Sequence, residues 1–133
     1  MSSFVISWLV AAAIILVLDG IWLTQIGPRL YRPLIGELLA PNVNITAAIA
    51  FYLIYVTGTV FLAVTPALDS GSITKALLLG AILGFVAYGT YDLTNHTTMK
   101  VWDIRVTLAD MAWGVFLTAS AAVGATFVTM QFR

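Results

Sequence analysis

Four long apolar stretches constrain this chain of 133 residues more than any other feature. Residues 4–26 carry a single charged side chain, Asp19, and residues 45–65 carry none. Residues 73–93 and 106–130 are similar stretches, and their few charged side chains lie near their ends. About 20 apolar residues in a helix cross the hydrocarbon core of a bilayer. Each stretch is therefore long enough to be a membrane-spanning helix.

The composition agrees with a location in the membrane. Apolar residues make up 61% of the chain and charged residues 9%, against about 25% charged in an ordinary soluble domain. A soluble domain of this size has too much surface for its volume to bury so many apolar side chains, which excludes a soluble enzyme. Six basic and six acidic residues leave no excess positive charge for nucleic acid. The absence of cysteine excludes disulfides and thiolate-bound metals.

We therefore predict an all-α fold, a four-helix transmembrane bundle with antiparallel neighbouring spans. One integral membrane domain is expected over residues 1–133, with spans at about 4–26, 45–66, 73–95 and 106–130. Pro28, Pro33 and Pro41 are expected to break the chain between the first two spans, because proline removes a helical N–H donor. Asn44 is expected to cap the second span.

The charged residues are concentrated on one side of the predicted bundle. Four spans put both termini on one side and the first and third connections on the other. The side of these connections holds Asp19, Arg29, Arg32, Glu37, Asp92, Lys100, Asp103, Arg105 and Asp110. Four of the six basic residues are among them, and the positive-inside rule therefore places this side in the cytoplasm and the termini outside.

Three aspartates lie within or close to the spans on this charged side, where an apolar environment makes a carboxylate costly. Asp19 either is protonated or reaches water, or it faces the bundle and meets a donor. Asp92 either belongs to a site or precedes a helix-terminating turn at Asn95 and His96, and an Asp–His pair four residues apart can also ligate a metal. Asp110 has the spacing of a capping box and would complement the dipole of its helix.

Asp19 and Asp110 are each followed three residues later by a tryptophan, Trp22 and Trp113. Because the two helices run in opposite directions, both Asp–Trp pairs are expected at a similar depth on the same side. Asp19 and Asp92 are expected near the C-terminal ends of their helices, where the dipole disfavours a negative charge. They would then need a cation or a shared proton. We predict that Asp19, Asp92 and Asp110 approach one another at one site.

Small residues in the third span predict a close helix contact. Ala76, Gly80 and Gly84 recur every four residues, which is the small-xxx-small pattern that lets two helix backbones approach. We predict that Gly80 and Gly84 face another helix, either within the chain or across a dimer.

Most of these polar residues belong to a longer pattern. It comprises Leu18-Asp19-Gly20-Ile21-Trp22-Leu23, Phe51-Tyr52-Leu53-x-Tyr55, Tyr91-Asp92-Leu93-Thr94-Asn95, Lys100-Val101-Trp102, Val106-Thr107 and Asp110-x-x-Trp113-Gly114. The pattern resembles the signature of the DUF2177 family of small bacterial membrane proteins over essentially the whole chain, except that Asp103 stands where the family would have proline. The resemblance implies a multi-pass protein of the bacterial cytoplasmic (inner) membrane. Members of the family often occur beside lipid-modifying enzymes, which favours lipid chemistry over transport.

Three classes of function are compatible with the sequence. The first is a membrane enzyme, or an enzyme component, that acts on a lipid or another amphipathic substrate. Its catalytic acid/base set would be Asp19, Asp92 and Asp110. The second is a small proton-coupled transporter, which is disfavoured because every acid lies near an interface rather than at mid-membrane. The third is a non-catalytic assembly subunit that uses the glycine stripe and the charged loops for docking.

The residues predicted to bind substrate surround these acids. They are Asn95, Lys100, Arg105, Trp22, Trp113 and Tyr91. Lys100 or Arg105 is expected to orient a phosphate or carboxylate headgroup. No metal site is predicted, and the sequence indicates no particular cofactor. The candidate partners are membrane lipids, a second copy of the chain or another membrane protein, and nucleic acid is not among them.

Overall fold

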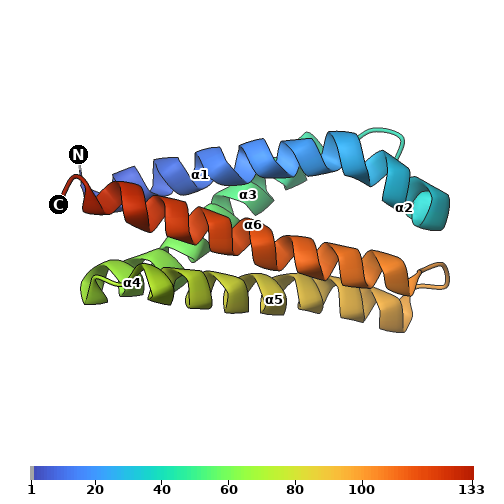
Figure 1. Ribbon diagram of the computed structural model, residues 1–133. Helices are drawn as coiled ribbons and strands as arrows, with labels where there is room; N and C mark the ends of the chain where they lie inside the picture. The colour runs from blue at the N-terminus through green and yellow to red at the C-terminus, as the bar shows by residue number, and fades with distance from the viewer. Residues whose placement is uncertain (1) are drawn as a thin grey trace.

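The computed structural model describes residues 2–133, and the chain is helical almost throughout. The helical segments form four long rods: Ser3–Leu38, Ile45–Ser70, Ile73–Thr98 and Ile104–Met130. Each rod is long and apolar enough to cross a membrane, which confirms the predicted all-α, four-span fold. The first rod begins and the last rod ends at the same end of the bundle (Figure 1).

Two of the rods are composite. The first contains α1 (Ser3–Ile21), a π-helical turn (Trp22–Ile26), α2 (Gly27–Ile35) and a 3-10 turn (Gly36–Leu38). The second contains α3 (Ile45–Thr59), a π-helical turn (Val60–Val64) and α4 (Thr65–Ser70). The third and fourth are single helices, α5 (Ile73–Thr98) and α6 (Ile104–Met130).

A side chain caps the start of every rod. Ser2, Asn44, Ser72 and Asp103 each accept a hydrogen bond from a backbone N–H of the first helical turn. These bonds satisfy donors that a helix start leaves free, and the cap predicted at Asn44 is confirmed. Gly71, in the left-handed conformation at a φ of 65°, ends the second rod.

Pro28 and Pro33 do not end the first helix, contrary to the prediction. Pro28 lies in the first turn of α2, directly after the π-helical turn Trp22–Ile26, where the regular helical hydrogen bonding is already altered. Pro66 has the same setting at the start of α4, after the π-helical turn Val60–Val64. A π-helical turn is a usual place for a long helix to bend, so each rod passes its proline without a break.

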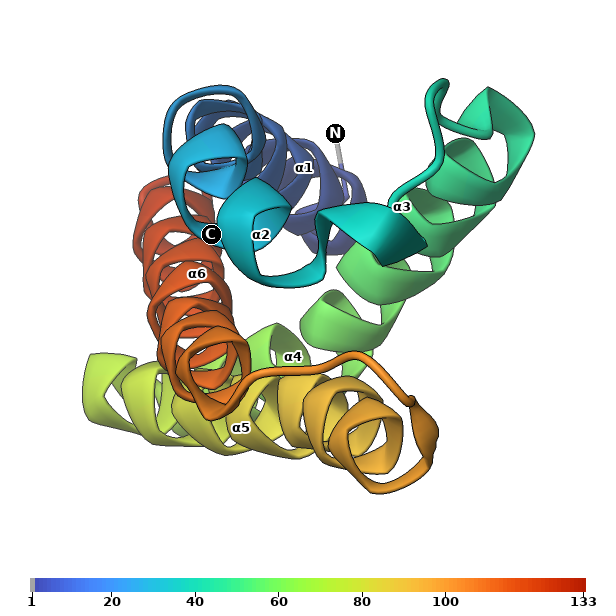
Figure 2. The same ribbon diagram turned by 90° about the vertical axis from the view of Figure 1, so that its right-hand side faces the viewer.

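The central helix of the bundle is α6, which packs between α1 and α5 (Figure 2). Ser7 of α1 bonds Thr129 of α6 at 2.8 Å between their hydroxyl oxygens. Asp19, further along α1, bonds Trp113, which lies earlier in α6. These two helices therefore run in opposite directions.

The helices α5 and α6 approach each other closely at two glycines of α5. A β-carbon on Gly84 would lie 2.2 Å from the carbonyl oxygen of Gly114, and one on Gly80 would lie 2.8 Å from the β-carbon of Ala122. Neither position has room for a larger side chain. The prediction that Gly80 and Gly84 face another helix is confirmed, and that helix belongs to the same chain.

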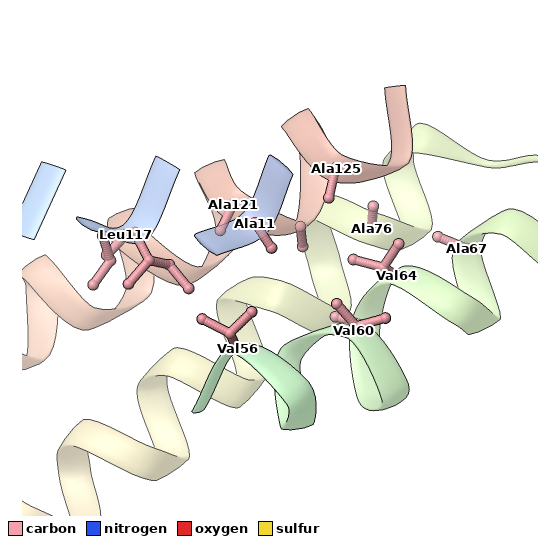
Figure 3. Packing of buried hydrophobic residues seen from close by; sticks show 12 residues of the cluster. Ala11, Val56, Val60, Val64, Ala67, Ala76, Leu117, Ala121 and Ala125 are labelled. Carbon is pink, nitrogen blue, oxygen red and sulfur yellow. The ribbon is translucent and has the colours of Figure 1, made fainter. Parts of the chain in front are cut away.

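The apolar core fills the half of the bundle nearer the termini (Figure 3). Small and β-branched side chains predominate there, so the helices can pack closely. The buried members are Ala11, Ile15, Val56, Val60, Ala63, Val64, Ala67, Ala76, Leu117, Ala121, Ala122 and Ala125.

Candidate functional site

A pocket of about 470 Å³ occupies the other half of the bundle, beside the first and third connections. Three aspartates line it among aromatic and aliphatic side chains from all four rods, and no lysine, arginine or histidine of residues 2–133 is among the lining residues. The lining residues are Asp19, Trp22, Leu23, Tyr31, Ile35, Phe51, Tyr55, Ala87, Tyr88, Tyr91, Asp92, Trp102, Val106 and Asp110.

Asp19 is buried and faces the bundle. The indole N–H of Trp113 donates to one carboxylate oxygen at 3.0 Å, and the hydroxyl of Tyr52 donates to the other. The sequence left open whether Asp19 reaches water or faces the bundle and meets a donor. The structure shows the second arrangement for Asp19. Its expected position near a helix C-terminus is wrong, because the rod continues through Pro28, and the helix dipole therefore has no end near this carboxylate.

Asp110 does not cap its helix, contrary to the capping-box interpretation. The helix α6 begins at Ile104, and Asp103 supplies the capping oxygen. Asp110 lies further along the helix and accepts a hydrogen bond from the hydroxyl of Tyr31 at 2.7 Å. The same hydroxyl accepts from the indole N–H of Trp22 at 2.8 Å. Asp110 therefore lines the pocket and does not belong to the helix start.

The two Asp–Trp pairs are interlocked across α1 and α6. The indoles of Trp22 and Trp113 stack with ring centroids 4.5 Å apart and planes 10° apart. Trp113 bonds Asp19 on the opposite helix directly, and Trp22 reaches Asp110 through Tyr31. Each tryptophan thus stabilises the aspartate of the other helix, using neutral donors only.

Asp92 has no such donor. Its side chain is fully buried, and neither carboxyl oxygen has a hydrogen-bond partner within residues 2–133. Its carboxyl group adjoins that of Asp110 across the contact between α5 and α6. Two ionised carboxylates are both acceptors and cannot satisfy one another, and an unpaired buried charge is costly. The pair is satisfied either by a shared proton or by a donor or cation that a ligand brings.

Asn95 and His96 continue α5 to Thr98 instead of ending it, so the predicted helix-terminating turn is wrong. His96 is exposed, and its Nδ1 lies 3.3 Å from the hydroxyl of Thr107. Within the described part of the chain, no three His, Cys, Asp or Glu side chains are grouped as metal ligands.

The sequence of the chain matches a known protein family over most of its length. Residues 4–127 match the family described as predicted membrane protein DUF2177. The chain belongs to the DUF2177 family. The matched residues include every residue that lines the pocket. No curated protein and no solved structure matches the chain. The family and the four apolar helices together identify a multi-pass membrane protein.

The residues predicted to bind substrate in this DUF2177 protein are only partly brought together. Tyr91 and Trp22 line the pocket, and Trp113 bonds its Asp19. Asn95, Lys100 and Arg105 are not among the lining residues. No cation for an anionic headgroup is therefore present in the pocket wall. The functional roles of all these residues stay predictions.

Lys100 and Arg105 lie on the outside of the third connection and the start of α6. Arg105 is exposed and pairs with Asp103 at 3.0 Å. Its hydrogen bonds lower the pKa of the Asp103 carboxyl to about 2. This ion pair is a local feature of the helix start, and its positive charge is already matched by a neighbour.

Two tyrosines that hold the aspartates were not predicted from the sequence. Tyr52 bonds Asp19, and Tyr31 bonds Asp110. Tyr31 and Ile35 both line the pocket from α2, whereas Arg29 and Arg32 on the same helix are exposed. The four-residue spacing of Tyr31 and Ile35 is the available signal of an amphipathic helix, and the expected proline breaks obscured it.

Proposed function

We propose that this protein binds an amphipathic molecule dissolved in the membrane and that Asp92 and Asp110 exchange a proton with its polar group. The supporting observation is Asp92, a fully buried carboxyl group without a partner in the wall of a largely aromatic pocket. Buried polar groups in proteins are nearly always hydrogen-bonded. An exception inside a concave, mostly apolar pocket is a candidate functional group.

The position of the pocket opening supports a substrate that arrives from the lipid. Leu23, Phe51 and Tyr91 line the pocket and yet are exposed. Phe51 belongs to α3 and Tyr91 to α5, and α3 leans away from α5 at this end of the bundle (Figure 2). An apolar chain can therefore pass between α3 and α5 while the attached polar group reaches the aspartates.

The depth of the pocket also suits an amphipathic molecule. On α2, Tyr31 and Ile35 face the pocket, and Arg29 and Arg32 are exposed. A basic amphipathic segment of this kind lies at the membrane surface, where it attracts anionic lipids. The aspartates would then lie just below the headgroups, where the polar end of such a molecule resides.

The three aspartates would have different roles. Asp92 and Asp110 are adjacent carboxyl groups, and such a pair retains one proton because like charges repel. One member can then act as an acid and the other as a base toward the bound polar group. Asp19 already accepts from Trp113 and Tyr52, so we assign it to positioning of the aromatic wall rather than to proton exchange.

Proton-coupled transport is a second candidate, and one observation favours it. Buried threonines follow Asp110 along α6 toward the termini, at Thr118, Thr126 and Thr129. The hydroxyl of Thr126 has no hydrogen-bond partner within residues 2–133. Hydroxyl groups can relay a proton, but the apolar core surrounds this row. Binding with local acid–base chemistry is therefore the better-supported function.

Comparative lipidomics tests the proposal. A strain lacking the protein is complemented with the wild type, Asp92→Asn or Asp69→Asn, each expressed at a verified level. Asp69 is an exposed acid at the end of α4, remote from the pocket lining, and serves as the matched control. We expect a change in a membrane amphiphile that the wild type and Asp69→Asn restore and Asp92→Asn does not. An unchanged profile, or full restoration by Asp92→Asn, would contradict the proposal.

A further inference from the structure

We infer that the polar group bound in this pocket is an organic cation, an ammonium group on an apolar body, and not an anionic headgroup. This assignment rests on the proposed binding function and specifies the ligand class of the same site. It starts from the charges of the wall. Three carboxyl groups line the pocket, and no basic side chain among residues 2–133 lines it.

The pocket offers hydrogen-bond acceptors in excess of donors. Asp19 has two neutral donors, Asp110 has one, and Asp92 has none. The one salt bridge within the described residues joins Arg105 to Asp103, away from the lining. An anionic group placed here would meet further negative charge and no cation. An ammonium group would neutralise the Asp92–Asp110 pair and occupy the free oxygens of Asp92.

Aromatic rings make the rest of the wall suitable for a cation. Tyr88 and Tyr91 lie on α5 on the same side as Asp92, and Trp102 contacts the Tyr91 ring edge-on at a centroid distance of 6.2 Å. The faces of such rings attract ammonium groups, most strongly where water is excluded. The volume of about 470 Å³ lies in the usual range for small-molecule sites. The wall therefore accommodates both a cationic head and an apolar body.

Binding of a cation releases a proton from the site. We expect the free protein to keep one proton on the Asp92–Asp110 pair, because two adjacent carboxylates repel one another. In the complex, both carboxylates are ionised around the ammonium group, so that one cation enters and one proton leaves to water. The other titratable groups facing this position are Asp19 on α1, Tyr31 on α2, Tyr55 on α3, and Tyr88 and Tyr91 on α5. The tyrosines stay neutral, and Asp19 keeps its own two donors.

The test uses the full chain in phosphatidylglycerol nanodiscs, which contain no ammonium lipid. Dimethyloctylammonium, octyl sulfate and octanol share one tail and differ in head charge, and the dimethylammonium head keeps an N–H that can donate to Asp92. Binding is followed by tryptophan fluorescence, because Trp22 and Trp102 line the pocket, with empty nanodiscs as the blank. We expect the ammonium probe to bind at least roughly tenfold more tightly than octanol, and octyl sulfate not to displace it.

The pH dependence and two variants complete the test. Between about pH 6 and about pH 8, affinity for the ammonium probe should rise by roughly tenfold per pH unit, for as long as the site holds its proton. Asp92→Asn should lose this dependence and at least roughly tenfold in affinity, whereas Asp69→Asn should match the wild type. The pH slope of the wild type alone keeps the test decisive if Asp92→Asn fails to fold.

Each other outcome has a distinct meaning. Equal binding of all three probes would overturn the cation assignment and leave the amphiphile site standing. Tighter binding of octyl sulfate, or a wild-type pH slope in Asp92→Asn, would also overturn it. No binding of any probe would count against the proposed function itself. In phosphatidylethanolamine nanodiscs, a weaker apparent affinity would identify the lipid headgroup as the source of the ammonium group, and an unchanged affinity would identify a free amphiphile.

Discussion

Each aspartate of the pocket has a different set of donors. Asp19 accepts from Trp113 and Tyr52, Asp110 accepts from Tyr31, and Asp92 accepts from no group in the described chain. Leaving a buried acceptor without its donor costs about 1–3 kcal/mol. Asp19 is therefore the acid with the most donors from the protein, and Asp92 is the acid without one.

Replacing Tyr52 by phenylalanine removes a donor from Asp19 and keeps the ring. We expect Tyr52→Phe to lower the free energy of unfolding by about 1–3 kcal/mol, measured by reversible unfolding in mixed micelles. Tyr91→Phe is the matched control, because Tyr91 is exposed and such changes usually stay within about 0.5 kcal/mol. Equal stability of the two variants would show that Asp19 does not depend on the Tyr52 hydroxyl.

At the scale of the helices, the contact between α5 and α6 is the most sensitive to side-chain size. A β-carbon at Gly84 would lie 2.2 Å from a backbone oxygen of Gly114, whereas one at Gly58 on α3 would meet nothing within 4 Å. Gly84→Ala should therefore destabilise the protein by about 1–3 kcal/mol, since the helices must separate. Gly58→Ala should be neutral or stabilising by up to about 1 kcal/mol. Similar melting of both variants would contradict this packing.

The apolar stretches predicted the existence of the four helices, but the prolines misled the prediction of their lengths. Pro28 and Pro66 each follow a π-helical turn and start a new α-helical segment without a break. Whether proline ends or only bends a helix depends on how the preceding turn widens. The shape of that turn depends on packing against other helices and cannot be predicted from the neighbouring residues alone.

The sequence predicted that Asp19, Asp92 and Asp110 lie in one region. The apolar stretches give the direction of each helix and the position of each aspartate along it, and therefore its depth in the membrane. The tyrosines that donate hydrogen bonds to two of these aspartates could not be predicted in this way. Tyr31 reaches Asp110 from 79 residues away, and Tyr52 reaches Asp19 from 33 residues away. Such pairs depend on helix rotation and tilt, for which one sequence contains no direct signal.

Across the whole molecule, four spans place both ends of the chain on one side of the membrane. The chain has no cysteine, so single cysteines can be introduced without background. We expect Asn42→Cys and Gln131→Cys to react with an impermeant maleimide from opposite sides, because one lies in the first connection and the other after α6. From the charge bias we further predict that Asn42 is labelled from the cytoplasmic side. Labelling of both cysteines from the same side would contradict the four-span topology.

The two halves of the bundle differ along its length. The half near the termini is filled by the apolar core, and the half near the connections contains the pocket and its acids. The core would hold the helices in place, and the proposed function requires that the pocket half be accessible from the lipid. Substitutions in the core should therefore affect stability first, and substitutions in the pocket wall should affect binding first.

The central claim is that a carboxyl group able to hold a proton lies in a pocket that membrane-dissolved molecules can enter. Dicyclohexylcarbodiimide tests it directly, because this apolar reagent adds to protonated carboxyl groups and leaves a stable N-acylurea that mass spectrometry locates. We predict modification at Asp92 or its neighbour Asp110, declining as the pH rises and blocked by dimethyloctylammonium. Modification confined to the exposed Glu37 and Asp69, with Asp92 and Asp110 unmodified at every pH, would contradict the claim.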